Sequence, residues 1–348
     1  MKPGILLLTA FLALTSCKRE QKKSSPEAVS VSNLVQYKEE SGGLHIKSGN
    51  FTYNFKKDQI PFKKVILLNA SMAGYIAELG AEELIIGVSS PEYIFSEKIQ
   101  EKIKEGKIKN VGNEQKYDVE KIISLKPDAI FTNHIASFDN TYELLKNNGI
   151  QVIFLDEYKE QKPLEKTAYL KLFGKLLGMD KKAEAEYAEI EKNYNELKQL
   201  ASKAKQKPLV LANEMYGDVW YLPGGKTSVA HYISDANAQY TLKNNTDEKA
   251  VTMGFEEVFS TSKGVKYWVN AGSHTSKKDM LNMNPFYSKL DVFNKGYVYG
   301  IGGREKDKAN DFFESGVVRA DWVLKDYIKI FHPELLPNYQ LTYMKELK

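Results

Sequence analysis

The stretch KVILLNASMAGYIAELGAEELIIGVSS, residues 64–90, predicts the fold of the chain. It begins with an apolar run at 64–69 that is typical of a buried strand, and the run at 84–90 predicts a second strand. Between them, MAGYIAELG has helical spacing, and we expect Ser71 to cap its start and Gly80 to close its end. This order of strand, helix and strand predicts a parallel sheet with helices on its faces.

The same alternation of strands and helices runs through most of the chain. Helix 117–127 leads into strand 128–133, and after residue 206 strands and helices alternate again. Between these regions, residues 163–205 contain no strand pattern, and their apolar residues recur at helical spacing. This segment is too long for one crossover in a small sheet, so we expect one long helix, or two abutting helices, to divide two halves.

The predicted fold class is therefore α/β, with two Rossmann-like lobes joined by a long helix. Short strand patterns at 34–60, separated by glycine, asparagine and aspartate, predict a β meander at the start of the first lobe. We expect the first lobe over 34–162, the connecting helix over 163–205 and the second lobe over 206–348. An amphipathic pattern at about 311–331 predicts a C-terminal helix in the second lobe.

The N-terminus has the features of an export signal. Lys2 precedes the apolar block 5–14, which is shorter than the ~20 residues that span a bilayer as a helix. The only cysteine, Cys17, ends the order Leu-Thr-Ser-Cys, which resembles a bacterial lipobox. We expect a signal peptide over 1–16 that is cut before Cys17, and a flexible tether over 17–33. A lipid on Cys17 would then anchor the protein to a bacterial membrane in the periplasm. An ordinary signal peptide is the alternative.

Composition and charge exclude several classes of function. The 49 lysines and arginines are balanced by 45 acidic residues, and only three of the basic residues are arginine. Because arginine is preferred for forked recognition of phosphate, nucleic-acid binding is disfavoured. The sequence has no G-x-S-x-G or H-E-x-x-H motif, and its glycines complete no nucleotide-binding fingerprint. We expect that the protein is not an enzyme and holds no resident cofactor. A pair of carboxylates that cleaves glycosidic bonds is an alternative that the sequence leaves open.

The histidines do not have the spacing of a metal site. His134 follows a predicted strand and is a candidate ligand for a haem or iron centre, although a hydrogen-bonding role is the commoner one. His231 falls on a predicted helix and His274 in a polar loop. Binding of a free zinc or manganese ion is therefore kept only as an alternative.

Several features together resemble the substrate-binding proteins of ABC importers for ferric siderophores, haem and cobalamin. They are the lipobox at Cys17, the stretches 67–90 and 111–133, and the long helical segment. The resemblance implies two lobes joined by a rigid helix, with the ligand in the cleft between them. It also implies an ABC permease dimer and its cytoplasmic ATPase as partners, and a small-molecule metal chelate as cargo. We expect the protein to be a monomer.

The resemblance further implies two residues that contact the permease. In that family, one glutamate on the outer surface of each lobe docks against arginines of the permease dimer. Glu120 matches the first of these places, and Glu256 the second, where the adjacent Glu257 is the alternative. Two fixed carboxylates, one on each lobe, are suited to align a two-lobed protein on a two-fold partner. The alternative for Glu120 and for Glu256 is an ordinary solvated glutamate on a helix, without a binding partner.

Candidate ligand-binding residues come from the ends of the predicted strands, because ligands of parallel α/β sheets lie beyond the carboxyl ends of the strands. Tyr93, Tyr216 and Trp220 are candidates for flat apolar contact with a chelate, and core burial is the alternative for each. Lys226 and Arg304 are candidates for contact with carboxylates or with a negatively charged complex.

The sequence leaves the cargo open. The scarcity of arginine favours a near-neutral corrinoid, whereas the family resemblance favours ferric siderophores. Two rival classes also stay open, a lipid-anchored hydrolase and a surface lipoprotein that captures a chelate without a permease.

Overall fold

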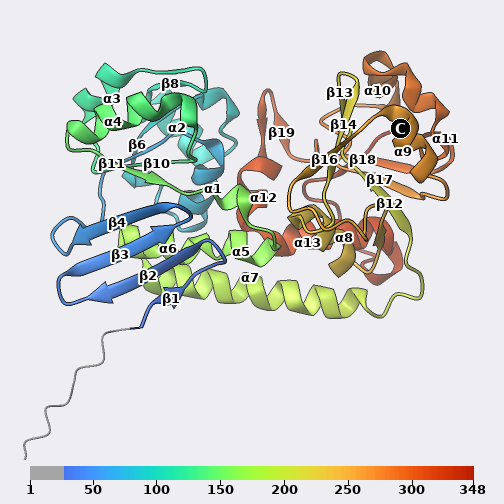
Figure 1. Ribbon diagram of the computed structural model, residues 1–348, viewed down its shortest axis with the longest axis horizontal. Helices are drawn as coiled ribbons and strands as arrows, with labels where there is room; N and C mark the ends of the chain where they lie inside the picture. The colour runs from blue at the N-terminus through green and yellow to red at the C-terminus, as the bar shows by residue number, and fades with distance from the viewer. Residues whose placement is uncertain (1–26) are drawn as a thin grey trace, which may run out of the picture.

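The computed structural model describes residues 27–348. The chain folds into two α/β lobes that stand side by side, and the long helix α7 (Asp180–Ala201) runs beneath both of them (Figure 1). The predicted fold class is confirmed. The expected signal peptide, Cys17 and most of the tether lie outside the described residues. Within residues 27–348, no helix combines the length and the apolar character needed to cross a membrane.

The first lobe is built on a five-stranded parallel sheet with the order β11-β10-β5-β6-β7. Its strands are β5 (Val65–Leu67), β6 (Ile85–Val88), β7 (Lys109–Asn110), β10 (Ala129–Thr132) and β11 (Gln151–Phe154). Its helices are α1 (Ala70–Glu78), α2 (Glu97–Lys104), α3 (Val119–Leu125) and α4 (Asp139–Asn147). A small hairpin of β8 (Gly112–Asn113) and β9 (Lys116–Tyr117) precedes α3. The strands predicted at 64–69, 84–90 and 128–133 are present with shorter bounds.

Helix α1 begins two positions earlier than the sequence pattern suggests. Its N-cap is Asn69, whose side-chain oxygen accepts a hydrogen bond from the Ser71 backbone N–H at 2.9 Å. The prediction that Ser71 caps this helix is therefore wrong, because the asparagine ahead of it already fills that place. The prediction for the other end is confirmed, since Gly80 follows the C-cap with φ +61°, a conformation that favours glycine.

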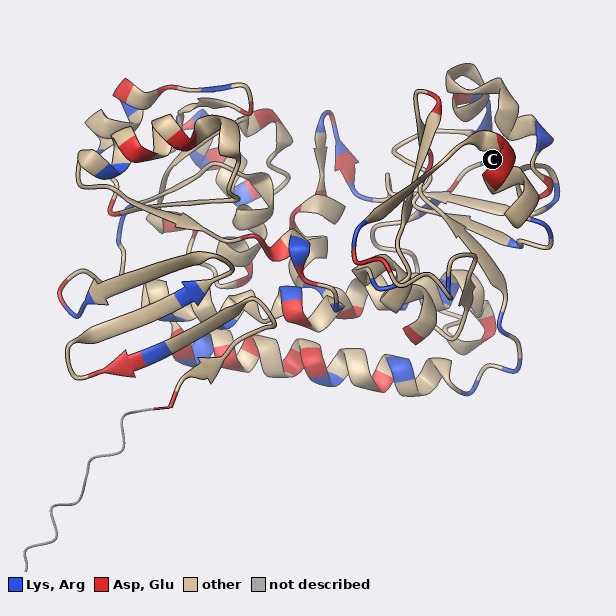
Figure 2. Cartoon of the chain, in the orientation of Figure 1, with Lys and Arg blue, Asp and Glu red and all other residues tan. Residues whose placement is uncertain are grey.

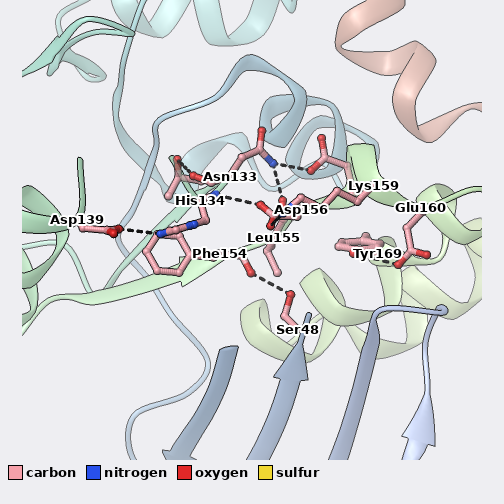
Figure 3. A network of polar contacts seen from close by, with 12 residues as sticks. Ser48, Asn133, His134, Asp139, Phe154, Leu155, Asp156, Lys159, Glu160 and Tyr169 are labelled. Atoms are coloured by element: carbon pink, nitrogen blue, oxygen red, sulfur yellow. Dashed lines mark hydrogen bonds and ion pairs between the residues drawn. The ribbon is translucent and has the colours of Figure 1, made fainter. Parts of the chain in front are cut away.

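The predicted meander is a four-stranded antiparallel sheet that leans against the first lobe. Its strands are β1 (Val29–Ser30), β2 (Val35–Glu40), β3 (Gly43–Ser48) and β4 (Phe51–Lys56). One face is buried in the lobe, as Val35, Ile46 and Phe55 show. The meander also holds the outer strand β11, because Ser48 Oγ donates to the Phe154 carbonyl at 2.9 Å and the Phe154 N–H donates to a tyrosine hydroxyl of β4 (Figure 3). An exposed edge strand is thereby covered.

The predicted connecting segment is three helices, of which one joins the lobes. They are α5 (Pro163–Thr167), α6 (Tyr169–Leu177) and α7. Gly178, with φ +70°, ends α6. Leu172 and Phe173 of α6 belong to the core of the first lobe, whereas α7 packs against both α6 and the last helix of the second lobe. The connection is thus α7 alone, about 33 Å long at 1.5 Å per residue.

The second lobe has a five-stranded sheet with the order β15-β12-β17-β18-β21, in which only β21 is antiparallel. Its strands are β12 (Leu209–Ala212), β15 (Gln239–Tyr240), β17 (Tyr267–Val269), β18 (Tyr297–Gly300) and β21 (Lys345–Glu346). An antiparallel ribbon of β13 (Met215–Tyr216), β14 (Val219–Pro223) and β16 (Ala250–Met253) packs beside it. Its helices are α8 (Ser228–Asp235), α9 (Phe255–Thr261), α10 (Lys277–Met283), α11 (Asp291–Lys295), α12 (Ser315–Val318) and α13 (Ala320–Phe331).

The helix predicted at about 311–331 is interrupted. A 3₁₀ turn over Asp311–Phe313 precedes α12, and Arg319 separates α12 from α13. Only α13 has the predicted amphipathic character, and it packs on α7. The preceding residues leave the second lobe and contact α1 of the first lobe, which is why the helical pattern does not continue through them.

Candidate functional site

A cavity of about 560 Å³ lies between the two lobes. The first lobe lines it with Asn69, Ala70, Ser71, Tyr93, Glu114, Asn133, Glu157, Tyr158 and Lys166. The second lobe lines it with Ser228, Val229, Tyr232, Ser273, Glu305, Lys308, Asn310, Phe312, Phe313, Gly316, Val317, Val323 and Tyr327. Because β5, β10 and β11 are adjacent and parallel, the residues that follow them meet at one edge of the sheet and form the wall of the first lobe.

The wall of the first lobe is a polar network. The Asn69 side chain donates to Asn133 Oδ1 at 2.5 Å, and Asn133 Nδ2 donates to Glu157 Oε2 at 2.8 Å. Ser71 Oγ lies 2.7 Å from Glu157 Oε1 and 2.9 Å from Asn69 Oδ1, so its single O–H is within donating distance of either acceptor. Figure 3 shows Asn133 directed toward the segment that follows β11. The network holds a carboxylate at the base of the cleft.

Glu157 is 2% exposed, and burial raises the pKa of its carboxyl group. The hydrogen bonds from Ser71 and Asn133 oppose this increase because they favour the ionised form. The charge of Lys166 opposes the increase as well, so the ionised form of Glu157 is favoured by these donors and by the nearby amine.

Lys166 of α5 also lines the cavity. Burial lowers the pKa of its ammonium group, and the charges of Glu157 and Glu160 raise it in part. Among residues 27–348, no hydrogen bond or ion pair is made by Lys166 Nζ. The cleft thus contains a buried carboxylate and a partly buried amine that act on one another through space without a hydrogen bond or ion pair between them.

Aromatic side chains make up much of the remaining surface. Tyr93 is 41% exposed, Tyr158 is 54% exposed, and Phe313 is 54% exposed. In the second lobe, Tyr232 and Tyr327 are stacked with ring centroids 5.7 Å apart. Exposed rings in a closed cleft are suited to bind the flat apolar face of a ligand.

The hairpin of β19 (Glu305–Lys306) and β20 (Ala309–Asn310) stands between the lobes (Figure 1). Lys308, in its turn, lies 5.9 Å from the ring centroid of Tyr93 in the other lobe. The hairpin carries both acidic and basic residues (Figure 2). Residues of opposite charge are interleaved in the same way over most of the molecule.

Below the hairpin, a set of contacts that we call the brace joins the lobes. Glu314 accepts hydrogen bonds from the backbone N–H groups of Phe95 and Ser96, at 2.6 and 2.9 Å, at the start of α2. Burial raises the pKa of Glu314 to about 7. Arg319 donates to Glu78 of α1 at 3.0 Å and also binds Asp321 through two nitrogens.

The brace brings two backbones very close together. A Cβ atom on Gly74 of α1 would lie 2.3 Å from the backbone oxygen of Glu314, so only glycine fits there. Thr167 Oγ1 of α5 donates to the Val318 carbonyl of α12 at 2.8 Å. The back of the cleft is therefore closed by direct contact between the lobes, in addition to helix α7.

Of the five predicted ligand-binding residues, Tyr93 lines the cavity. Trp220 is fully buried beside Trp268, and its indole N–H donates to the Ala212 carbonyl, so it offers no face to a ligand and that prediction is wrong in this structure. Tyr216 is 83% exposed at the turn of the β13–β14 hairpin, outside the cavity. Side chains of β14 alternate between its two faces, and Trp220 lies on the inner face, which is why it is packed in the core and not in the cavity.

The two predicted cations also lie outside the cavity lining. Lys226 is exposed in the loop ahead of α8. Arg304 forms an ion pair with Asp311 at 2.9 Å, and its guanidinium lies 5.3 Å from the ring centroid of Phe95. Arg304 therefore helps to join the two lobes and does not line the cavity.

The histidines have local partners. His134 Nε2 lies 2.7 Å from Asp139 and its ring packs among aromatic side chains (Figure 3). His274 Nε2 lies 2.6 Å from Glu214, whose hydrogen bond raises the pKa of His274. In the described part of the chain, no three histidine, cysteine or acidic side chains gather in a way that would hold a metal ion.

Glu120 and Glu256 occupy equivalent places on the two lobes. Each lies in the first turn of a short helix, α3 or α9, and each is exposed. Both helices lie on the side of the molecule away from α7 (Figure 1). Glu257 is also exposed in the first turn of α9.

Sequence reasoning missed Glu157, Lys166, Lys308 and Phe313 as residues of the cleft. For Glu157 a signal existed, because it directly follows the apolar run IQVIFLD at 150–156, which is typical of a strand. For Lys166 none existed, since a lysine in a polar helical pattern normally faces solvent.

The comparisons with known proteins agree with this architecture. The model of a family described as periplasmic binding proteins matches residues 65–305, more than half of the chain. The chain is similar to an uncharacterized lipoprotein of Methanocaldococcus jannaschii, with 24% identity over 81% of this chain and 68% of that protein.

Two solved structures show the same fold. One is Helicobacter pylori CeuE with nickel(II) bound, with TM-score 0.63 and 18% identity, covering 85% of this chain and 91% of that one. The other is a periplasmic haem-binding protein of Vibrio cholerae, with TM-score 0.61 and 13% identity, covering 78% of this chain and 99% of that one.

Proposed function

This chain belongs to the periplasmic binding protein family, and from that premise we propose that it binds a small-molecule metal chelate in the interlobe cleft. We further propose that it delivers the chelate to the permease dimer of an ABC importer, whose cytoplasmic ATPase drives uptake, and that it works as a monomer. The lipid on Cys17 keeps it at the periplasmic side of a bacterial membrane. The haem and nickel named for the two similar structures are consistent with a metal-containing cargo.

The cleft itself is the observation that supports this proposal most directly. It lies at the carboxyl ends of the parallel strands of the first lobe, and its volume of about 560 Å³ is typical of small-molecule sites. It combines exposed rings with a few convergent polar groups, which suits a large, flat, partly polar ligand.

Capture of the ligand requires little movement of the lobes. The brace ties α1 and α2 to the segment around α12, and α7 spans both lobes as one uninterrupted helix. Domain closure by a hinge needs a few residues that absorb a large backbone change. We expect small-angle scattering to give nearly the same radius of gyration with and without saturating ligand, and a large decrease would contradict this.

Binding is tested with the chain from residue 24 onward, which lacks Cys17. Haem, cyanocobalamin and a panel of ferric siderophores are titrated while tryptophan fluorescence is followed. We expect saturable quenching by one of them with one-to-one stoichiometry. If no chelate of the panel binds, the proposed function is wrong.

Delivery to the permease is tested through Glu120 and Glu256. In cells that depend on the protein for uptake, we expect the double variant Glu120→Ala, Glu256→Ala to abolish transport, while its affinity for the ligand in solution stays unchanged. Glu189→Ala, on the opposite side of the molecule in α7, is the matched control and should transport normally. Normal uptake by the double variant would contradict the docking role, and the further exchange of Glu257 tests whether that neighbour replaces Glu256.

A further inference from the structure

We propose that the base of the cleft, through Glu157 and Lys166, binds a neutral carboxamide-type group of the cargo and discriminates against a carboxylate at the same place. The inference rests on the proposed function and deepens it by naming the chemical class of the ligand group. It arises from the hydrogen-bonding capacity that the described residues leave unused in the cleft.

The wall of the first lobe has unused acceptor capacity. A carboxylate offers about four acceptor positions, and the oxygens of Glu157 use one each, for Ser71 and Asn133. The donors of these two side chains are already directed within the protein, toward Glu157, Asn69 and the Leu155 carbonyl. A ligand group that meets this wall must therefore supply N–H or O–H donors.

The base of the cleft has unused donor capacity. An ammonium group has three donors and no acceptor, and Lys166 Nζ makes no hydrogen bond or ion pair with any residue of 27–348. Since a buried charge without a partner is unfavourable, this amine is best stabilised by an acceptor oxygen on the ligand. The same ligand group must then present a donor to Glu157 and an acceptor to Lys166.

The charges around the cleft disfavour a carboxylate. Its lining contains three acidic side chains and two basic ones: Glu114, Glu157 and Glu305, with Lys166 and Lys308. The arginines of the described chain are engaged elsewhere, Arg304 with Asp311 and Arg319 with Glu78 and Asp321. A ligand carboxylate at the base would gain Lys166 but would stand beside the buried carboxylate of Glu157, and like charges at short distance repel strongly where the dielectric is low.

A cationic group is disfavoured for the opposite reason, because it would bind Glu157 and be repelled by Lys166. A primary or secondary carboxamide is neutral and planar and carries a donor and an acceptor on the two atoms bonded to its carbonyl carbon. Its N–H can reach the carboxylate while its carbonyl oxygen accepts from the amine. This fit distinguishes the site from a pocket that selects only by size and apolar surface.

The experiment uses pairs of probes that differ only in this group. The first pair is haem and haem diamide, in which both propionates are converted to primary carboxamides. The second is cyanocobalamin, whose rim carries primary carboxamides, and its monocarboxylic acid derivatives. The dissociation constant of each is measured with the chain from residue 24 onward. We expect the amide member of at least one pair to bind about tenfold more tightly than its acid.

Two variants connect this preference with the named residues. In Glu157→Gln, which keeps the shape but removes the charge, we expect the preference to fall to about threefold or less. In Lys166→Met, binding of both members should weaken by about tenfold or more, because both lose the donor. Glu189→Gln removes an exposed charge far from the cleft and is the control that should leave every ratio unchanged.

The outcomes separate the inference from the function beneath it. If chelates bind but the wild-type protein prefers the acids or shows no preference, the inference is overturned and the proposed function stands. The same holds if the preference persists in Glu157→Gln. If neither member of any pair binds, and no siderophore binds, both are overturned. Circular dichroism of each variant shows whether it is folded. If Glu157→Gln does not fold, the ratio of the wild-type dissociation constants for acid and amide still decides the question.

Discussion

The two walls of the cleft are built in different ways. The wall of the first lobe is a hydrogen-bonded network of Asn69, Ser71, Asn133 and Glu157, placed by three neighbouring parallel strands. The wall of the second lobe, which we call the aromatic wall, combines the rings of Tyr232, Phe312, Phe313 and Tyr327 with polar side chains of the β19–β20 hairpin. The polar residues that follow the equivalent strands of the second lobe bind one another, as Glu214 and His274 do.

Because of this difference, we expect residues that stabilise the fold and residues that contact the ligand to lie on different walls. The polar wall is buried and its members satisfy one another, so a change there leaves a buried group without a partner. In the aromatic wall, Phe313 is 54% exposed, so a change there removes contact surface for a ligand and little else. We therefore expect variants of the polar wall to affect folding, and variants of Phe313 to affect binding.

The largest effect should come from the brace, which holds the two walls at their distance. Arg319→Ala leaves the carboxylates of Glu78 and Asp321 without their cation in an environment where Asp321 is 1% exposed. Breaking such a buried pair typically lowers the free energy of unfolding by about 3–5 kcal/mol. Urea unfolding measures this loss. Lys295→Ala, in an exposed pair with Asp291, is the control and should lower it by less than about 0.5 kcal/mol.

A smaller loss is expected in the polar wall. Ser71→Ala removes a donor from the buried Glu157 and from Asn69, which should lower the free energy of unfolding by about 1–3 kcal/mol. Ser124→Ala, an exposed serine of α3, should be close to neutral. Equal stability of the two variants would show that the polar wall does not support the fold, and the contrast between the walls would fail.

The brace should also make stability depend on pH. The pKa of Glu314 is about 7 in the folded protein and ordinary in the unfolded chain, so its contribution is fully present below about pH 4.5. It is lost as pH rises from about 4.5 toward 7, because the carboxyl of the unfolded chain ionises in this range, whereas burial and Asp311 keep that of the folded protein protonated, with only partial compensation from Arg304. The loss should be on the order of 1–3 kcal/mol.

Thermal unfolding of wild type and Glu314→Gln between pH 4.5 and 8 measures this effect. The variant has no charge to titrate, so its stability relative to wild type should increase with pH across this range. Other groups that titrate there, such as His274, are common to both proteins and cancel in the difference. Parallel pH curves for the two proteins would show that Glu314 does not titrate in the brace.

The smallest effect on stability is expected in the aromatic wall. Phe313 is 54% exposed, so Phe313→Ala should change the free energy of unfolding by less than about 0.5 kcal/mol. The same variant should weaken binding of a flat chelate by about tenfold, because a ring worth about 1.4 kcal/mol of contact is lost. Phe286→Ala, which removes an exposed ring outside the cleft, should leave the affinity unchanged. A large loss of stability in Phe313→Ala would remove the distinction between the walls.

Local patterns were sufficient for the elements of the fold. The strand–helix–strand pattern at 64–90 corresponds to β5, α1 and β6, and the meander and the long α7 were also recognised. These features follow from hydrophobic periodicity, which depends only on neighbours in the chain. The places where strands end were also predictable, and with them Tyr93 as a residue of the cleft.

Contacts between distant parts of the chain were not predictable in this way. The run VWYLP at 219–223 shows a strand but not which of its faces is buried, and only the packing of β14 against Trp268 decides that Trp220 is inside. The helical pattern at 311–331 contains no sign that Glu314 and Arg319 bind residues more than 200 positions earlier.

The amino-acid sequence by itself determined the two α/β lobes, the helix between them and the edge of the sheet where a ligand would lie. Only the tertiary structure decided which polar groups face that ligand and which are used to join the lobes. The physical reason is that secondary structure depends on local periodicity, whereas the burial and pairing of Glu157, Lys166 and Glu314 depend on how complete elements dock against one another.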